Sequence, residues 1–468
     1  MHLITHVVLL FIAIGFPLYG ICATPVSSDS IPPGWDYPSD FDQSQLPDPE
    51  WWQQFGDTTL DSLISYGITN NYDIAMSARR VEIAHLTMNT AKSGYMPQLA
   101  ISAGWIKDRT SGSISRYNPH SGTDDYWNAG LNMSWEIDLF GKIHESVKNK
   151  KGLWQASKAE YAGTIVSVCA GIASAYINLR MYQEQLALAE AHKDSQLKVV
   201  KITEARHEAG IASMLDVAQA KTVYYSTCAT IPELKTAIHN SINAIAILIG
   251  VFPDEIESKL NSPGSLPDYR HIIRTGVPAD LLRRRPDIAA AEKELSAYAA
   301  ELGLAKKDFL PTLTLNGSIG TSAHHAGDLF TGKSFTYTIA PTLSWTVFDG
   351  MSRRYNTLAA RQQMETGIEN YNLTVLTAVK EADNAMCSYV NTIERIDSID
   401  QTVTQCKKAM ELSLDLYKRG LSPFTDVVDS QISLLEYQTQ YISARGTALS
   451  ALISLYEALG GGWNASDM

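Results

Sequence analysis

The sequence predicts a mainly α-helical protein with a smaller β portion, built as a tandem repeat of two strands followed by a long helical hairpin. Two observations predict this fold. Residues 210–217 (GIASMLDV) return as residues 420–427 (GLSPFTDV), and in each half the hydrophobic pattern changes from a period of two to spacings of three and four. A fixed-period repeat indicates that each half is one copy of the same structural unit.

The two copies align over most of their length. Trp135 corresponds to Trp345 at a shift of 210, whereas Pro97 corresponds to Pro311 at a shift of 214. Because the shift changes between Pro97 and Trp135, the loop in this stretch must differ in length between the two repeats. The predicted segments are residues 24–50 (extended linker), 51–260 (first repeat), 261–463 (second repeat) and 464–468 (short tail).

Residues 1–23 predict a secretory signal peptide. Their apolar run is too short to span a bilayer permanently, and small residues follow it. Residues 18–22 (LYGIC) resemble a lipoprotein box that would end before Cys22, but Ile21 stands where that box has a small residue. Lipidation of Cys22 and ordinary cleavage after Ala23 both stay open. No second long apolar segment follows, so we expect no helix to cross a membrane.

Composition excludes several classes of function. A formal net charge of −12 and the lack of a basic stripe argue against nucleic acid as a partner. The longest basic run, residues 283–285, is short and leads into a helix. No Gly-rich phosphate loop follows a strand, and the pair His207 and Glu208 lacks the second histidine of a zinc motif. We therefore expect no catalytic residue, no cofactor and no metal site.

Four segments alternate between apolar and polar residues, which predicts strands. Alternation alone also fits a soluble sheet with one wet face. The length of roughly 9–11 residues and the aromatic residues at the ends, such as Trp105 and Trp127, favour strands of a membrane β-barrel. The four predicted strands are residues 98–106, 127–139, 312–320 and 335–347.

A long helical pattern follows each pair of strands. Apolar residues from Ile165 to Ala189 are spaced three and four apart, which is typical of coiled-coil seams. A helix of about 65 residues would be roughly 100 Å long. The predicted long helices are residues 141–209 and 213–250 in the first repeat, and 350–419 and 423–460 in the second.

Four strands cannot close into a barrel. In a membrane every backbone polar group must be paired and no sheet edge can stay open, and the smallest familiar barrels have eight strands. A barrel made from this chain must therefore take strands from several copies.

Three motifs give the chain a clear resemblance to a known family. They are residues 51–57 (WWQQFGD), 135–142 (WEIDLFGK) and 276–288 (GVPADLLRRRPDI). On these motifs the chain resembles the TolC-like outer-membrane efflux proteins, in particular the subgroup that serves resistance-nodulation-division (RND) pumps. The resemblance covers about residues 48–463, which is nearly everything after the signal and linker.

The resemblance implies a homotrimer in the outer membrane. Three copies would supply a 12-stranded β-barrel continuous with a long periplasmic α-barrel. The channel would work with a periplasmic adaptor (membrane fusion protein) and an inner-membrane RND-type pump. It would be a passive conduit that exports small molecules such as drugs, without catalysis and with an iris-like gate at its periplasmic tip.

The hairpin turns contain the candidate gate residues. Asp426 and Asp429 are three apart and share a helix face, and the resemblance implies two rings of negative charge at the entrance. Asp426 could also be only a helix-start residue, because the repeat places Asp216 at the same position. Tyr417 and Asp216 match a polar latch of the family. Ser422 stands where the TolC branch has an arginine, so we expect a weaker latch here.

The same turns are candidates for adaptor docking. Their residues are small, which lets another helical hairpin come close, although any tight helix reversal uses similar residues. The candidate docking residues are Gly210, Ala212, Ser213, Gly420, Ser422 and Pro423.

Two alternatives to a drug-efflux channel are left open by the sequence. Within the same class, the chain could be the outer-membrane channel of type I protein secretion or of heavy-metal efflux. From another class, it could be a soluble periplasmic helical scaffold, although that gives no reason for strands with aromatic ends. The sequence does not name the cargo, the pump or the adaptor.

Overall fold

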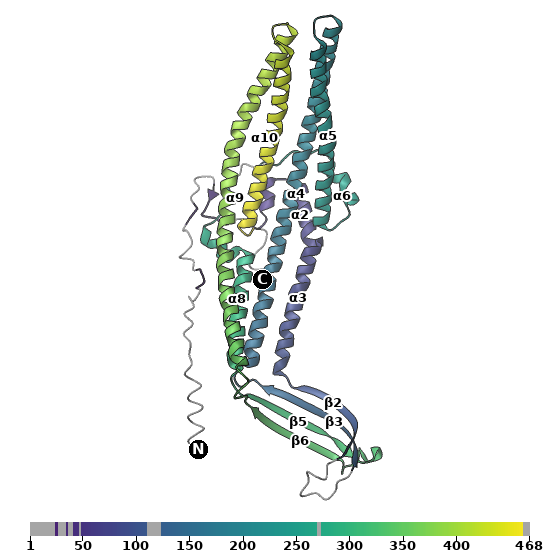
Figure 1. The fold of residues 1–468 in the computed structure, drawn as a ribbon, viewed down its shortest axis with the longest axis vertical. Coiled ribbons are helices and arrows are strands. Elements are labelled where there is room, and N and C mark those ends of the chain that lie inside the picture. The colour runs from purple at the N-terminus through teal and green to yellow at the C-terminus, as the bar shows by residue number, and fades with distance from the viewer. Residues whose placement is uncertain are drawn as a thin grey trace.

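The computed structural model describes residues 24–26, 34–35, 41–45, 48–109, 123–268 and 273–461. A sheet lies at one end of the molecule, and two helical hairpins extend from it and end in two turns at the opposite end (Figure 1). The predicted signal peptide, Cys22 and the tail lie outside the described residues.

The sheet is antiparallel and contains two strands from each repeat, in the order β2-β3-β5-β6. Pairing between β3 and β5 joins the two repeats, whereas β2 and β6 each have one neighbour. Within one chain the sheet therefore has two open edges. The strands are β2 (Gln98–Arg109), β3 (Thr123–Ile137), β5 (Thr312–Ala323) and β6 (Phe335–Ser344).

The predicted strand boundaries were wrong at several ends. Residues 345–347 are not in β6, because Ser344 pairs with Thr312, the first residue of β5, and the partner strand ends there. β3 ends at Ile137 rather than at residue 139, because Asp138 turns to the next helix. Its carboxylate oxygens accept hydrogen bonds from the N–H groups of residues 143 and 144.

At their other ends β2, β3 and β5 extend further than predicted. Arg109 pairs with Thr123, and Trp127 pairs with Ala323, so the hairpin ladders continue beyond the predicted strand ends. Polar residues at the tip of a hairpin are compatible with backbone pairing, and composition alone does not locate the last pair.

Large apolar side chains of the strands are exposed in the single chain. Ile101 is 86% exposed, Ile339 73% and Tyr337 71%. A soluble protein rarely exposes so continuous an apolar surface, whereas a sheet in a bilayer faces lipid with such residues. The exposed strand residues therefore favour the membrane interpretation over a sheet with one wet face.

Each hairpin pairs a very long helix with a shorter one. α4 (Lys142–Glu208) packs along α5 (Met214–Ile249), and α9 (Ser352–Lys418) packs along α10 (Phe424–Ala458). At 1.5 Å per residue, α4 and α9 are each about 100 Å long.

We expected no helix that could cross a membrane, but the length and hydropathy of α4 would allow it to do so. Among the described residues it is the helix long and apolar enough to do so, with a window of mean hydropathy 1.5. Packing explains this composition, because 56% of that window is buried inside the protein. A buried core helix and a membrane-spanning helix have similar compositions.

Two further helices continue the shorter arm of each hairpin toward the sheet. α3 (Tyr72–Lys92) packs on α4 beyond the end of α5, and α8 (Pro286–Lys307) packs on α4 and α9 beyond the end of α10 (Figure 1). The remaining elements lie around these two junctions and at the loops. They are β1 (Phe41–Asp42), η2 (Trp51–Phe55), α2 (Thr58–Asn70), η3 (Ser93–Tyr95), α6 (Pro253–Leu260), β4 (Ile273–Arg274), η4 (Pro278–Asp280), α7 (Leu281–Arg284) and η5 (Ala326–Asp328).

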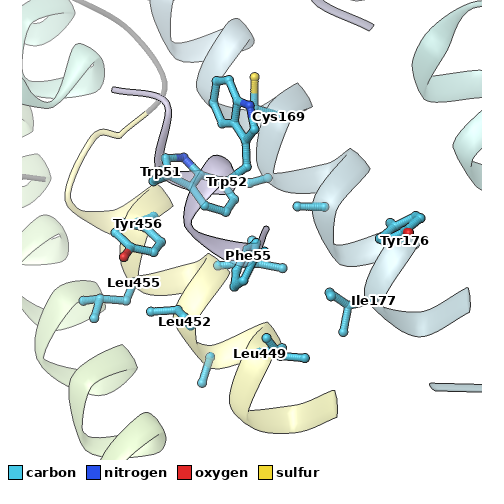
Figure 2. Packing of buried hydrophobic residues seen from close by; sticks show 14 of the residues in the cluster. Trp51, Trp52, Phe55, Cys169, Tyr176, Ile177, Leu449, Leu452, Leu455 and Tyr456 are labelled. Atoms are coloured by element: carbon cyan, nitrogen blue, oxygen red, sulfur yellow. The ribbon is translucent and has the colours of Figure 1, made fainter. Parts of the chain in front are cut away.

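The main hydrophobic core lies near these junctions. Trp51 stacks on Tyr456 with ring centroids 5.0 Å apart and makes T-shaped contacts with Trp52 and Phe55 (Figure 2). These aromatic residues fill the space between α4 and the end of α10. The motif at residues 51–57 is therefore a packing element that fixes the middle of the helical portion.

The predicted linker is partly built into the fold. β1 pairs in parallel with β4, and the Phe41 side chain is buried in the core. Nearer the N-terminus, Asn372 of α9 accepts a hydrogen bond from the Val26 N–H at 2.8 Å and donates one to the Thr24 carbonyl at 3.1 Å. The sequence did not reveal these contacts, because each joins residues that are far apart in the chain.

Candidate gate at the hairpin turns

Both hairpins reverse at a glycine in the left-handed conformation. Gly210 and Gly420 each have a φ of 74°, which costs a residue with a Cβ atom more than it costs glycine. The following N–H groups bond back to the helix end, from Ile211 to the Arg206 carbonyl at 2.8 Å and from Leu421 to the Leu416 carbonyl at 2.9 Å. The repeat thus specifies two identical helix stops.

The two return helices begin differently. Ser213 caps α5: its Oγ accepts from the Asp216 N–H at 3.1 Å and donates to Asp216 Oδ1 at 2.7 Å. Pro423 stands at the same place before α10 and offers no side-chain cap. Asp216 is therefore held in a defined position, whereas within the described residues no capping side chain holds its repeat counterpart Asp426.

The structure brings Tyr417 and Asp216 together across the two hairpins. Tyr417 Oη, at the end of α9, donates to Asp216 Oδ2, at the start of α5, at 3.4 Å. Tyr417 is only 5% exposed. Burial raises the pKa of its phenol, and the nearby Asp216 carboxylate raises the pKa further. The hydroxyl therefore keeps its proton at neutral pH and remains a hydrogen-bond donor.

Arg206 is a third member of this contact, and sequence reasoning missed it. Its guanidinium carbon lies 4.9 Å from the centre of the Tyr417 ring, and its Nη1 donates to the Lys418 carbonyl at 2.9 Å. An arginine in the last turn of a helix is ordinary, and its repeat counterpart is Leu416. Nothing in the sequence therefore distinguished it from a residue that only caps its own helix.

Apolar packing supports these polar contacts. The Tyr417 ring lies 5.0 Å from the Phe424 ring, centroid to centroid. A small buried cluster, separate from the main core, joins α4 and α5 to α9 and α10 here. Its members are Val199, Val200, Ala220, Tyr417, Phe424 and Val427.

The predicted gate aspartates lie on the surface of α10. Asp426 is in the first turn of the helix, where the helix N-terminus stabilises a carboxylate, and Asp429 is one turn further along. Both side chains are exposed. The helix-start interpretation therefore applies to Asp426, and it leaves Asp429 unexplained.

The candidate docking residues lie at the extreme ends of the hairpins. Gly210, Ser213, Gly420 and Pro423 are exposed, and Ala212 and Ser422 are half-buried. Large apolar side chains surround them and were not among the predicted site residues. These exposed residues are Ile211, Met214, Leu215 and Leu421.

The fold and these turns agree with the family comparison. The model of the outer membrane efflux proteins matches residues 63–251 and 277–461, one match in each repeat. The chain belongs to the outer membrane efflux protein family. The two matched segments contain both hairpins and the strands β2, β3, β5 and β6, so the whole channel portion is accounted for.

Relatives and solved structures of this efflux family match nearly the full chain. The pyoverdine export outer membrane protein OpmQ of Pseudomonas aeruginosa is 28% identical and covers 96% of this chain and 95% of its own. The toluene efflux pump outer membrane protein TtgF of Pseudomonas putida is 27% identical, covering 90% and 87%. The structure of the outer-membrane channel OprN is 26% identical, with a TM-score of 0.86 over 96% of this chain and 98% of that one.

The family establishes the class and place of the protein. It is an outer-membrane channel of a tripartite efflux system, of the mainly helical TolC-like fold, and channels of this family work with an adaptor and an inner-membrane pump. Membership of a family of outer-membrane channels argues against the alternative of a soluble periplasmic scaffold.

Proposed function

We propose that three copies of the chain form one continuous conduit across the outer membrane and into the periplasm, and that this conduit exports small molecules without catalysing a reaction. The observation that supports this is the four-stranded sheet with two open edges and exposed apolar side chains. Joining β6 of one copy to β2 of the next would remove every edge, and three copies give twelve strands.

The trimer is tested by its mass. The purified full-length protein in detergent should have the mass of three chains by light scattering after subtraction of the detergent. A Pro substitution at Ile339, in the middle of the edge strand β6, should reduce the trimer, because it would remove a backbone donor on the open edge of the sheet. The same substitution in the loop at Lys333 is the control. A monomer of the unaltered protein that still conducts would contradict the proposal.

The contacts at the hairpin turns form the gate in this proposal. Tyr417 and Asp216 hold the two hairpins together by a hydrogen bond, and Arg206 holds the same tyrosine through its ring. Opening separates α9 and α10 from α4 and α5, so it breaks both contacts. The hydrogen bond is worth a net of roughly 0.5–1.5 kcal/mol, which suits a contact that must open.

Asp426 and Asp429 form rings of negative charge at the entrance in the trimer. Such rings attract cations within about 10 Å at ordinary salt concentration. Replacing both with Asn should lower the ratio of cation to anion permeability in planar bilayers, on the order of twofold. Glu411→Gln, which alters an exposed carboxylate of α9, is the matched control. An unchanged reversal potential in the double Asn variant would reject the rings.

The hairpin ends bind the periplasmic adaptor. Small residues at the turns permit close approach, and the exposed apolar residues Ile211 and Leu421 offer surface for a partner to bury. Trp at both Ser213 and Ser422 should abolish efflux without lowering the amount of trimer. A photo-crosslinker at Leu421 should capture an adaptor in cells, and efflux that survives both Trp substitutions would place docking elsewhere.

Small organic molecules are the proposed cargo class. Relatives of similar length are named for pyoverdine export and for toluene efflux, and these support small molecules over polypeptides. The choice between drugs, metal ions and other compounds belongs to the RND-type pump in this proposal, because the channel offers a generic path. Identifying the pump by crosslinking through the adaptor would therefore identify the cargo.

A further inference from the structure

The short helix before each pair of strands ends in the same way in both repeats. α3 ends at Lys92, and α8 ends one residue after Lys306, where each helix meets the sheet (Figure 1). The two lysines are equivalent at the shift of 214, and both are exposed. An aromatic residue follows three positions later, Tyr95 in the first repeat and Phe309 in the second. Each copy of the chain therefore has two such helix ends.

A tryptophan is fixed to each of these helix ends. Trp135 Nε1 donates to the Tyr95 carbonyl at 2.9 Å. In the second repeat, Trp345 Nε1 donates to the Phe309 carbonyl at 3.0 Å. Trp135 lies on the same face of β3 as Leu131, which is the apolar face of the sheet. Residues three apart share a helix face, so each lysine lies on the side of its helix end that carries the aromatic residue.

The tryptophans of β3 indicate where the membrane surfaces lie. Trp127, near the other end of this strand, packs near Trp105 with ring centroids 6.5 Å apart. Trp127 and Trp135 are roughly 27 Å apart along the strand, comparable with the apolar band of about 25 Å in a membrane barrel. Tryptophan gathers at both surfaces of a bilayer. In the barrel proposed above, on which this step rests, Lys92 and Lys306 therefore lie at the depth of lipid headgroups.

The two lysines have no acidic partner in the part of the chain that the structure describes, because the carboxylates of the junction have other partners. Asp138 caps α4 through its carboxylate oxygens, and Glu136 lies on the opposite face of β3 from Trp135. Three further carboxylates are in ion pairs: Lys142 with Asp308 at 2.7 Å, Lys307 with Glu145 at 3.0 Å and Arg353 with Asp349 at 2.8 Å. The positive charges of Lys92 and Lys306 are thus uncompensated.

We propose that Lys92 and Lys306 bind the phosphates of anionic phospholipids in the membrane leaflet on the helical side, two sites in each copy of the chain. A phospholipid matches both parts of the surface, because its acyl chains can cover Trp135 and Trp345 while its phosphate meets the ammonium group. Lysine at a membrane surface attracts anionic lipid, and its long side chain extends to the headgroups. A soluble anion would leave the exposed aromatic surface uncovered.

The test uses the full-length protein in phosphatidylcholine vesicles that contain a trace of spin-labelled phosphatidylglycerol or, separately, of spin-labelled phosphatidylcholine. Electron paramagnetic resonance measures the fraction of each label that the protein holds. We expect phosphatidylglycerol to be held about threefold more strongly than phosphatidylcholine, and less so in high salt. Lys92→Gln combined with Lys306→Gln should remove most of this preference, because glutamine is polar but carries no charge.

Lys201→Gln combined with Lys408→Gln is the matched control. Both lysines are exposed, on α4 and α9, and lie roughly 85–90 Å along these helices from the sheet. This control changes the net charge by the same amount, so it should keep the preference for phosphatidylglycerol. An equal loss in both double variants would mean that overall charge alone attracts the lipid, and it would overturn the two sites.

Two further outcomes would also overturn the sites. They are equal holding of both lipids by the unaltered protein, and a full preference that survives in the Lys92 and Lys306 variant. Either result would leave the lysines as complements of the helix dipoles. A protein that holds no lipid of either kind would instead contradict the membrane barrel of the proposed function, so the two failures are distinguishable.

Discussion

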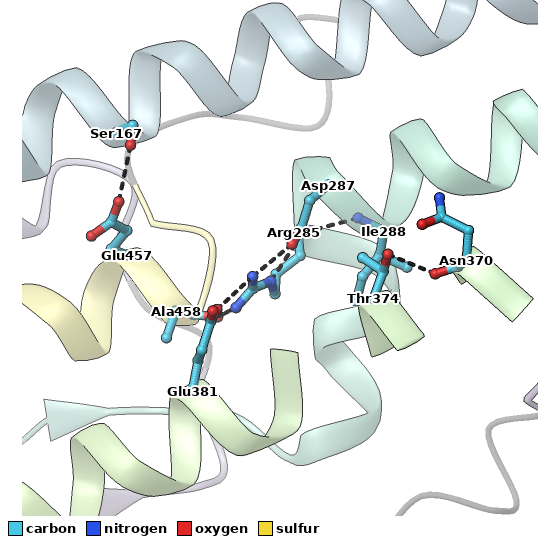
Figure 3. A network of polar contacts seen from close by, with 9 residues as sticks. All are labelled: Ser167, Arg285, Asp287, Ile288, Asn370, Thr374, Glu381, Glu457 and Ala458. Carbon is cyan, nitrogen blue, oxygen red and sulfur yellow. Dashed lines mark hydrogen bonds and ion pairs between the residues drawn. The ribbon is translucent and has the colours of Figure 1, made fainter. Parts of the chain in front are cut away.

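Arg285 Nη1 donates a hydrogen bond to the carbonyl oxygen of Ala458 at 3.0 Å, where α10 ends and α8 begins (Figure 3). In the first repeat Asn71 Nδ2 donates to the Leu248 carbonyl at 2.7 Å, where α5 ends and α3 begins. At both junctions a side chain before one helix satisfies a terminal carbonyl of another. The two short helices of each repeat are thereby joined end to end along the long helix.

Replacing Arg285 should loosen the second junction. Arg285 Nη2 also pairs with Asp287 Oδ2 at 2.6 Å and with Glu381 Oε2 at 2.8 Å. Arg285→Gln loses both ion pairs, although the two carboxylates are partly exposed and can rehydrate. The free energy of unfolding should fall by about 2 kcal/mol, measured by denaturant unfolding in detergent. Arg354→Gln, on the exposed face of α9, should change it little, and an equal loss there would contradict the junction role.

Cys169 should resist thiol reagents in the folded protein. It is fully buried in α4, and burial raises the pKa of its thiol from the ordinary 9.0 to about 12. The thiolate is the reactive form, so at pH 8 only on the order of 10⁻⁴ of this thiol could react. Maleimide labelling and mass spectrometry should find Cys228, Cys387 and Cys406 modified in the native protein, and Cys169 only after denaturation.

The same shift predicts how stability depends on pH. Because the folded pKa of Cys169 is raised, its contribution to stability is present below pH 9.0 and is lost as the pH rises toward 12. Cys169→Ala should therefore lessen the alkaline loss of stability, measured as the difference in unfolding free energy between pH 8 and pH 11. Native labelling of Cys169 at pH 8 would show that this part of α4 opens.

Breaking the latch should make the channel leak. Tyr417→Phe combined with Asp216→Ala removes the hydrogen bond between the hairpins but keeps the ring packed on Phe424. Losing a net of roughly 0.5–1.5 kcal/mol should raise the open population about two- to tenfold. Single-channel recordings and cellular uptake of a large antibiotic measure this. Tyr225→Phe, an exposed tyrosine of α5, is the control, and unchanged leakage in the double variant would reject the latch.

Much of the fold could be predicted because both repeats have the same pattern of apolar residues and turns. The turns at Gly210 and Gly420, the long seams of α4 and α9 and the alternating strands all follow from local periodicity. The ends of β3 and β6 could not be predicted, because they depend on where the partner strand stops and on the use of Asp138 as a cap. The burial of Phe41 was likewise invisible, since its partner Ile273 is distant in sequence.

The candidate gate was only partly predictable. Tyr417 and Asp216 could be paired through the family resemblance, and the structure places them in contact. Arg206 could not be found, because its role depends on how the two hairpins cross rather than on its own helix.

Arg206 provides the sharpest test of the gate, because its guanidinium lies over the ring of Tyr417. Arg206→Ala should raise leakage by itself, since a partly buried cation–π contact is worth roughly 0.5–2 kcal/mol. Arg419→Ala is the matched control, because that arginine forms a local ion pair at the end of α9, with Asp415 at 2.9 Å.

Combining variants separates the two contacts of Tyr417. The effect of Arg206→Ala should add to that of Tyr417→Phe, because phenylalanine keeps the ring on which the guanidinium stacks. Tyr417→Ala removes the ring. In that background Arg206→Ala should raise leakage much less than it does in the unaltered channel. Equal additivity in both backgrounds, measured as open probability in planar bilayers, would mean that Arg206 acts through its bond to the Lys418 carbonyl instead.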